Sequence, residues 1–239
     1  MYWKVPNIWE GGKCFIIGGG NSMTEQFNIP QEVVDKVMMG INPLSTYSPY
    51  LSFLHDKHVI AVNEAFKLGS WIDVLFWGDD NYYKTRNTEI LGFEGLRVTC
   101  MNEQIMSQKI KNLKRHSFKK NNYTLIGVSE DVSKVAWNVH KGNSGSAAIN
   151  LAVHFGVKEI YLIGFDMNLD ANNNQHWHNS YHTNITTVGG TFKRHLLNFP
   201  QIAEDLNRLG IKCINLNPNS AINDFEKMTV TDLINNYNG

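Results

Sequence analysis

A short run of small residues follows the first apolar segment of the chain and could hold a phosphate group. The residues after Lys13–Ile17 are, in order, Gly18, Gly19, Gly20, Asn21 and Ser22. Glycine lets the backbone approach a phosphate closely, and the Ser22 hydroxyl could donate a hydrogen bond to it. The run is not a dinucleotide fingerprint, because Met23 replaces the third glycine, and it lacks the Lys-Ser or Lys-Thr ending of a P-loop. We interpret it as a nucleotide-binding turn of another type, with an ordinary tight turn as the alternative.

Polar residues also follow the next two apolar segments. Asn63 comes directly after Val59–Val62, and its amide can both donate to and accept from a base, ribose or phosphate. Asp79 and Asp80 follow Val74–Trp77, and adjacent carboxylates suit a hard cation such as Mg²⁺ that carries a diphosphate. Because neighbouring side chains in an extended strand point to opposite faces, both aspartates can bind one ion only in a turn. A turn-forming asparagine and a helix-capping aspartate are the simpler alternatives.

A stretch of small residues opens a helical pattern before the central apolar segment. Apolar residues recur at helical spacing over Ser144–Phe155, and Glu159–Ile163 then leads to Asp166. The small residues that open the helical pattern are Asn143, Ser144 and Gly145. A helix N-terminus beside the C-terminal end of a strand makes a place for an anion. We therefore expect phosphate there, and we interpret Asp166 as the structural end of a strand that positions the loop after it.

Three histidines, His176, His178 and His182, lie within seven residues after the central segment. They could bind a transition metal, but no cysteine or carboxylate accompanies them at a recognised zinc spacing. A histidine in a polar loop after a strand is well suited to proton transfer, because its usual pKa is close to neutral. We therefore favour proton transfer over metal binding.

The segments that carry these residues alternate between strand-like and helical patterns. The strand-like segments are Lys13–Ile17, Val59–Val62, Val74–Trp77, Leu96–Cys100, Thr124–Val128, Glu159–Ile163 and Lys212–Leu216. The helical segments are Gln31–Met38, Ser144–Phe155 and a stretch from about Phe192 to Leu209. This alternation predicts an α/β protein: a single Rossmann-like domain over residues 1–239, with a mostly parallel sheet flanked by helices.

Composition narrows the classes of partner. The 22 basic and 22 acidic residues cancel, so bulk charge predicts no nucleic-acid or membrane partner. No run of eighteen apolar residues is present, and the first residues do not form a secretory signal, so we expect a cytoplasmic protein. Cys14, Cys100 and Cys213 are expected to be buried, reduced side chains, since each lies in or just beyond a strand-like segment.

A basic segment interrupts the alternation at about 103–142. No acidic residue lies between Glu103 and Glu130. The basic residues of this interval are Lys109, Lys111, Lys114, Arg115, Lys119 and Lys120. The segment is either a solvated excursion or a lid that meets a negatively charged substrate or acceptor.

The motifs, taken in this order, resemble those of the bacterial sialyltransferases of the Campylobacter lipooligosaccharide type. The resemblance runs from about Gly12 to Asp224, and it extends to a broader family of unknown-function proteins, common in bacteria and phages. That family includes the archaeal 6-hydroxymethyl-dihydropterin diphosphokinase. Gly18–Ser22 stands where the sialyltransferases have a Gly-Asn-Gly-Pro-Ser turn, and Val157–Met167 resembles their central strand almost residue for residue.

The resemblance implies roles for individual residues. Asn63 and the Ser144–Gly145 pair match residues that contact the nucleotide in the family. His182 matches the general base at the end of a His-x-x-x-His pair, and His178 matches its first histidine. The segment Cys213–Phe225, which contains Asn217, Pro218, Asn219 and Ser220, resembles the family's Cys-Pro-Asn-Ser strand and loop. This resemblance implies nucleotide contacts for Asn219 and Ser220.

Two departures from the family's pattern bear on the chemistry. Asn168 occupies the first of two positions at which the sialyltransferases use tyrosines to hold the departing phosphate. Gly78, Asp79 and Asp80 stand where those enzymes carry an asparagine. The sialyltransferases need no metal for chemistry, so the aspartates favour a diphosphate bound through Mg²⁺.

Three functions are consistent with these residues. The leading hypothesis is a glycosyltransferase that moves a sugar from a nucleotide-sugar donor to an acceptor hydroxyl, on a glycan or a small molecule. The alternative is a Mg²⁺-dependent pyrophosphokinase that transfers diphosphate from ATP to a hydroxyl. A third is a catalytically silent nucleotide-binding module, which would have no need of a titratable base. The acceptor and the oligomeric state, including a homo-oligomer, are left open by the sequence.

Overall fold

The central feature of the fold is an eight-stranded sheet. The structure is a computed structural model that describes residues 1–116, 127–137, 142–180 and 185–237, and for residues 185–189 it describes the backbone only. The strands of the sheet are β1 (Lys13–Ile17), β2 (His58–Val62), β3 (Val74–Trp77), β4 (Leu96–Thr99), β5 (Ile110–Asn112), β8 (Glu159–Ile163), β9 (Lys212–Asn215) and β10 (Glu226–Lys227). The order is β10-β9-β8-β1-β2-β3-β4-β5, and each neighbouring pair is parallel. The predicted single Rossmann-like α/β domain is confirmed.

The strand order reverses between β1 and β8. From β1 the chain proceeds to β2 on one side, and β8 later returns to pair with β1 on the other side, with Ile17 opposite both Ala61 and Ile163. In open parallel sheets, ligands bind in the crevice outside the carboxyl ends of the strands at such a reversal. The glycine-rich turn after β1 and the Gly164–Asp166 segment after β8 lie at this crevice.

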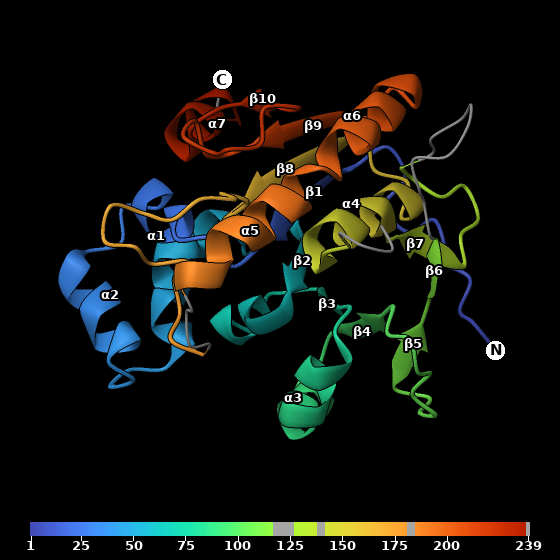
Figure 1. Ribbon diagram of the computed structural model, residues 1–239, viewed down its shortest axis with the longest axis horizontal. Coiled ribbons are helices and arrows are strands. Elements are labelled where there is room, and N and C mark those ends of the chain that lie inside the picture. The colour runs from blue at the N-terminus through green and yellow to red at the C-terminus, as the bar shows by residue number, and fades with distance from the viewer. Residues whose placement is uncertain (117–126, 138–141, 181–184, 238–239) are drawn as a thin grey trace.

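Helices cover both faces of the sheet (Figure 1). The elements on one face are α4 (Ser144–His154), α5 (Ile185–Leu196) and α6 (Phe199–Arg208). The elements packed on the other face are α1 (Ser22–Gln26), α2 (Gln31–Met38), η1 (Leu44–Leu54), η2 (Asn63–Leu68), α3 (Asp80–Gly92) and α7 (Val230–Tyr237). Successive residues of β1 alternate between the two hydrophobic cores, with Ile16 in one and Phe15 and Ile17 in the other. Burial on both faces explains why these strands are continuous apolar runs.

The basic segment contributes a small sheet of its own. The strands β6 (Lys114–His116) and β7 (Lys134–Ala136) pair in parallel and stand apart from the main sheet. The expected strand Thr124–Val128 is wrong where it can be tested: Gly127 and Val128 lie in bends, and residues 124–126 are outside the described residues. The Asp205 carboxylate explains the difference, because it accepts hydrogen bonds from both backbone amides, over 2.5 and 2.8 Å, in place of a strand partner.

The single helix expected from Phe192 to Leu209 is two helices. α5 ends at Leu196, and α6 begins at Phe199 with Pro200 in its first turn. Proline lacks a backbone N–H and its ring clashes with the carbonyl four residues earlier, so α5 has to end before it, while the start of a new helix accepts it readily.

Two further expectations concern cysteines and membranes. Cys14, Cys100 and Cys213 are buried and form no disulfide, and burial raises the pKa of the Cys100 thiol to about 12. Among the described residues, no helix combines the length and apolarity needed to cross a bilayer.

Candidate functional site

A pocket of about 320 Å³ opens at the carboxyl ends of β1, β2, β3 and β8, where the strand order reverses. We call it the main pocket. The residues predicted from the sequence that line it are Gly18, Gly19, Gly20, Asn63, Asp79, Asn143, Ser144 and Gly145. Residues far apart in the chain therefore meet in one cavity, because parallel strands deliver their carboxyl ends to the same edge of the sheet.

The glycine-rich turn packs too closely against its neighbours to carry side chains. A Cβ on Gly18 would lie 2.8 Å from the Gly164 carbonyl oxygen, and one on Gly20 would lie 2.6 Å from the Asp166 carboxylate. One on Gly19 would lie 2.9 Å from Nδ1 of His176. Contacts within the protein thus require glycine at these positions, and they keep the turn flat against the end of β8.

The N-terminus of α4 faces the main pocket. Asn143 caps the helix, since its Oδ1 accepts a hydrogen bond from the Ser146 amide over 2.7 Å. The Ser144 hydroxyl accepts from the Gly78 amide over 3.1 Å, which ties the helix to the end of β3. The positive end of the helix dipole favours an anion here.

Two amide side chains in the pocket wall have an unsatisfied hydrogen-bonding atom. Oδ1 of Asn63 and Nδ2 of Asn143 are both buried, and neither has a hydrogen-bond partner within the described protein. Asn63 also adopts a left-handed backbone conformation, with a φ of 54°. A buried polar atom without a partner and a strained backbone are both features that concentrate at ligand sites. Both residues line the pocket, so a ligand bound there is the candidate partner for these two atoms.

The first histidines of the predicted loop dock against the glycine-rich turn. Nδ1 of His176 lies 3.1 Å from the Gly19 carbonyl oxygen, and the Trp177 indole donates to the Gly18 carbonyl over 2.8 Å. His176 lines the main pocket, and its ring stacks on that of His178 at a centroid distance of 5.0 Å. Burial lowers the pKa of His176, opposed in part by the Gly19 carbonyl and Asp166.

His178 lies behind the pocket wall and is only 3% exposed. Burial lowers the pKa of its ring to about 3, and the positive charges of Lys67 and Arg86 contribute to the shift. Its Nδ1 accepts from the Ser180 amide over 3.3 Å. At neutral pH this ring is uncharged and engaged within the loop. His182, the predicted general base, lies outside the described residues.

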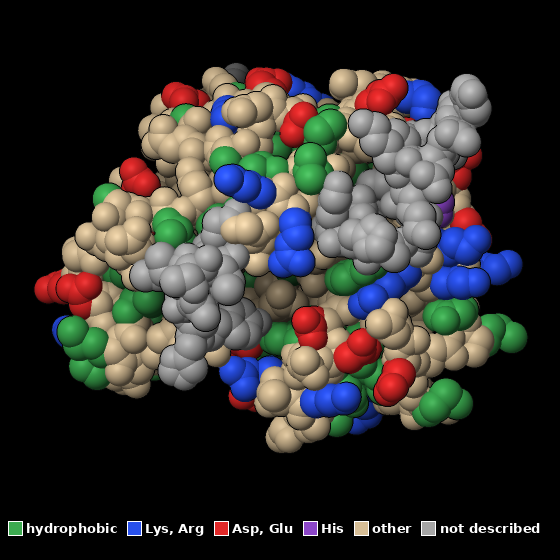
Figure 2. All heavy atoms as spheres, viewed as in Figure 1, with side chains coloured by type: hydrophobic (Ala, Val, Ile, Leu, Met, Phe, Trp, Pro, Cys, Tyr) green, Lys and Arg blue, Asp and Glu red, His purple; other side chains and the backbone are tan. Residues whose placement is uncertain are grey.

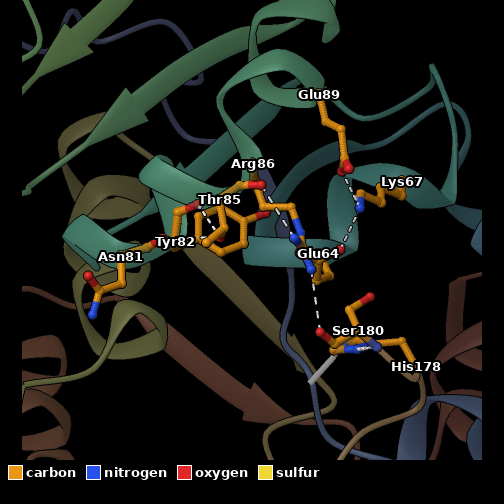
Figure 3. Close-up of polar contacts among 9 residues, drawn as sticks. All are labelled: Glu64, Lys67, Asn81, Tyr82, Thr85, Arg86, Glu89, His178 and Ser180. Atoms are coloured by element: carbon orange, nitrogen blue, oxygen red, sulfur yellow. Dashed lines mark hydrogen bonds and ion pairs between the residues drawn. The ribbon is translucent and has the colours of Figure 1, made fainter. Parts of the chain in front are cut away.

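A buried ion-pair network supports the loop that carries the histidines (Figure 3). Glu64 is fully buried, and its two carboxylate oxygens lie 3.0 Å from Nε of Arg86 and 2.8 Å from Nζ of Lys67. Arg86 also donates to the Ser180 carbonyl over 3.4 Å, and Lys67 forms a second ion pair with Glu89. Glu64 thereby ties η2 to α3, and Arg86 ties α3 to the histidine loop.

Asp166 connects the segments at the back of the pocket. Its carboxylate accepts from the Ser22 amide over 2.8 Å, from the Ser22 hydroxyl, and from Nδ2 of Asn217 over 2.9 Å. Ser220 donates to the Phe165 carbonyl over 2.7 Å. The structure therefore places Ser22 and Ser220 in buried contacts away from the main pocket, and Asn219 on a neighbouring cavity.

The two aspartates after β3 diverge. Asp79 lines the main pocket and caps α3, where its Oδ1 accepts from the Asn81 amide over 2.7 Å. Asp80 turns away and accepts a long hydrogen bond from Asn102, 3.4 Å in length. The described residues contain no cluster of three or more side chains suited to hold a metal. Mg²⁺ often binds one or two protein carboxylates together with substrate phosphates, so the single carboxylate of Asp79 is enough for such a site. The magnesium site stays a prediction.

Arg115 anchors the basic segment beside the pocket. Its guanidinium lies 3.9 Å from the ring centroid of Trp137, which lines the pocket, and its Nε donates to the Cys100 carbonyl over 2.7 Å. Figure 2 shows further Lys and Arg side chains gathered beside β6. The action of this segment as a lid stays a prediction.

Four further residues line the cavity without a pocket role predicted from the sequence: Trp137, His176, Phe192 and His195. Burial lowers the pKa of His195 to about 4, with Arg194 adding to the effect. His176 belongs to the histidine cluster seen in the sequence. No sequence motif surrounds Trp137, Phe192 or His195. Their place in the pocket depends on how α5 and β7 pack against α4.

Comparisons with known proteins identify relatives by fold. No protein-family model and no curated protein sequence matches the chain. One similar solved structure is the MAf glycosyltransferase from Magnetospirillum magneticum AMB-1, with 12% identity and a TM-score of 0.50; the match covers 94% of this chain and 35% of that one. Another is the Campylobacter jejuni sialyltransferase CstII in complex with the substrate analogue cytidine-5'-monophosphate, with 15% identity and a TM-score of 0.46. That match covers 91% of this chain and 84% of the CstII chain. This chain spans about a third of the length of the MAf protein, and the likeness to that protein shows a shared fold.

Proposed function

We propose that the chain is a glycosyltransferase that takes a sugar from a nucleotide-sugar donor and transfers it to an acceptor hydroxyl. The observation that carries the proposal is the main pocket itself. It joins a helix N-terminus, a tightly packed glycine turn and two unsatisfied amides at the reversal point of a parallel sheet. The fold shared with the MAf glycosyltransferase is consistent with this activity.

The residues divide the work between binding and transfer. The N-terminus of α4, at Ser144 and Gly145, binds the donor phosphates, and its dipole stabilises the negative charge that develops on the leaving phosphate. Asn63 and Asn143 pair with polar groups of the nucleotide, because each has a buried atom that needs a partner.

His182 is the proposed base. The acceptor oxygen attacks the anomeric carbon, the bond from that carbon to the phosphate oxygen breaks, and the histidine takes the acceptor's proton. His178 is buried and accepts a hydrogen bond from the Ser180 amide, so its proposed part is to support the loop that carries the base. A variant His182→Ala should lose transfer and keep nucleotide binding, and full activity in this variant would remove the assignment.

A thermal-shift panel tests the donor class directly. The panel contains CMP-, UDP-, GDP- and ADP-linked sugars and ATP, each with Mg²⁺ and with a chelator. Stabilisation by a nucleotide-sugar, followed by mass-spectrometric detection of transfer, supports the proposal. Stabilisation by no nucleotide overturns it.

The position of Asp79 supports a second candidate function, that of a pyrophosphokinase. This carboxylate lines the pocket next to the phosphate-binding helix end, where it could share Mg²⁺ with a diphosphate. Stabilisation by ATP with Mg²⁺ alone, and AMP as the product, would favour this activity over sugar transfer. Binding without any turnover would favour the silent nucleotide-binding module.

A further inference from the structure

A second cavity, of about 460 Å³, lies on the other side of Asp166 from the main pocket. We call it the amide pocket. It is built from α1, the start of α2, the loop after β8 and the loop after β9. Its polar lining includes Asn21, Glu25, Asn168, Asp170, Asn172 and Asn219. No lysine, arginine or histidine is among its lining residues in the described chain.

The wall of the amide pocket is fixed by hydrogen bonds. Asp166 is satisfied by Ser22 and Asn217, and Asn21 donates to Asp170. Asp170 in turn accepts from the backbone amides of Asn172 and Asn174, which closes the turn after it. Hydrogen bonds therefore join α1 to the two loops that form the cavity.

Other side chains on the cavity are exposed and available to a ligand. Glu25 and Asn172 are exposed, and Asn219 is exposed with its backbone carbonyl accepting from Asn168 over 3.0 Å. A carboxylate accepts from hydroxyls, and an amide both donates to and accepts from them. Ile29 and Val34 also line the cavity, and both are buried side chains of the hydrophobic core.

The charge of the cavity excludes anions. Glu25, Asp166 and Asp170 contribute negative charge, and no cation on the described lining offsets it. A phosphate or carboxylate group would be repelled, while an uncharged ligand with many hydroxyls would find partners throughout. The main pocket differs, because a helix N-terminus faces it.

The two cavities share a wall. Asp166 and Asn168 line both, so a molecule in the amide pocket borders the site of the donor phosphates. We propose that the amide pocket binds the acceptor, and that the acceptor is an uncharged saccharide. This inference rests on the proposed glycosyltransferase function, since an acceptor site is needed only by a transferase.

Saturation-transfer NMR with two sets of probes tests the inference. The neutral probes are lactose, maltose, cellobiose and N-acetyllactosamine, and the anionic probes are 3'-sialyllactose and glucose 6-phosphate. The wild type should bind at least one neutral probe and neither anionic one. The variant Glu25→Lys, which reverses a charge on the cavity lining, should bind that neutral probe at least ten-fold more weakly.

A matched control separates the effect of charge on the cavity lining from the effect of charge elsewhere on the surface. Glu32→Lys reverses the charge of an exposed residue of α2 that does not line the amide pocket, and it should bind the neutral probe as the wild type does. Failure of every neutral probe, or equal binding by the wild type and Glu25→Lys, overturns the inference. Nucleotide binding is followed by thermal shift in the same variants. If nucleotides bind and saccharides do not, the acceptor site alone fails; if saccharides bind and nucleotides do not, the proposed function fails.

Discussion

The backbone amide of Ser22 donates to Oδ2 of Asp166 over 2.8 Å, and this bond joins the first turn of α1 to the end of β8. The same carboxylate accepts from Asn217 on the loop after β9, and it is only 6% exposed. Asp166 therefore holds together the wall between the main pocket and the amide pocket. Three donors of the protein bond to this carboxylate, which agrees with a positioning role.

Removal of this carboxylate should destabilise the fold. In Asp166→Ala the donors on Ser22 and Asn217 stay buried without an acceptor, which we expect to cost about 2–4 kcal/mol of unfolding free energy. Urea denaturation measures the change. Asp56→Ala, at an exposed aspartate, should show no measurable change. A stable Asp166→Ala protein that has lost only its activity would instead place this residue in the reaction.

The buried carboxylate of Glu64 should stabilise the fold by neutralising two cations. Glu64→Ala leaves Arg86 and Lys67 without their shared partner, but both cations are about a quarter exposed and can recover some hydration. We therefore expect a loss of about 2–3 kcal/mol, below the full cost of an unpaired buried charge. Glu89→Ala removes only the exposed end of the network and should cost much less. Equal losses in the two variants, measured by urea denaturation, would contradict the central role of Glu64.

The two unsatisfied amides allow a test of nucleotide recognition without loss of the fold. Asn63→Gly removes the buried Oδ1 atom and tolerates the left-handed backbone, so stability should hold while nucleotide affinity falls about ten-fold. Asn143→Asp keeps the oxygen that caps α4 but replaces the unpaired donor with negative charge beside the phosphate site. Its helix should remain intact and its nucleotide affinity should fall further. Calorimetric titration gives both affinities; unchanged binding in both variants would remove the amides from the site.

The fold was largely predictable because its central strands are buried on both faces. Apolar runs identified β1, β3 and β8 with the correct bounds. The bounds of α2 were also predicted correctly, from a helical segment led by Pro30. α3 went unnoticed because Asp80–Gly92 lacks an apolar stripe, and the edge strand β10 is only two residues long.

Within the site, the residues at strand ends and at the start of α4 could be predicted, since the order of elements alone brings them together. Ser22 and Ser220 turn elsewhere, because their hydroxyls bond to the Asp166 carboxylate and the Phe165 carbonyl. Such partners are chosen by the folded geometry, and no sequence motif records them. The same holds for Trp137 and His195, whose place in the pocket depends on the packing of neighbouring elements.

The lowered histidine pKa values predict a loss of stability in mild acid. The pKa of His178 is about 3 and that of His195 about 4, below the usual value of about 6.5 in an unfolded chain. Between these values the unfolded state binds more protons than the folded state, so stability is greatest above about pH 6.5 and falls as the pH decreases toward 4. Melting temperatures at intervals from pH 7.5 to 4.5 should show this slope, and His178→Gln should flatten part of it. A flat profile in the wild type would show that these rings are accessible to protons in the fold.

The same glycine-to-alanine substitution should have opposite effects on stability at two positions, Gly20 in the glycine-rich turn and Gly92 in α3. A Cβ on Gly20 would lie 2.6 Å from the Asp166 carboxylate and 2.7 Å from the Gly164 carbonyl, and neither neighbour can move without breaking the wall of the pocket. Gly20→Ala should therefore destabilise the fold by about 1–3 kcal/mol and weaken nucleotide binding as well.

Gly92, at the end of α3, has nothing within 4 Å of its Cβ position, so Gly92→Ala serves as the matched control. It should leave nucleotide binding unchanged and raise stability by about 0.4–1 kcal/mol, because alanine restricts the unfolded chain. Urea denaturation and calorimetric titration of both variants make the comparison. If Gly20→Ala behaves like Gly92→Ala, the close packing of the turn against β8 is not what holds the main pocket in shape.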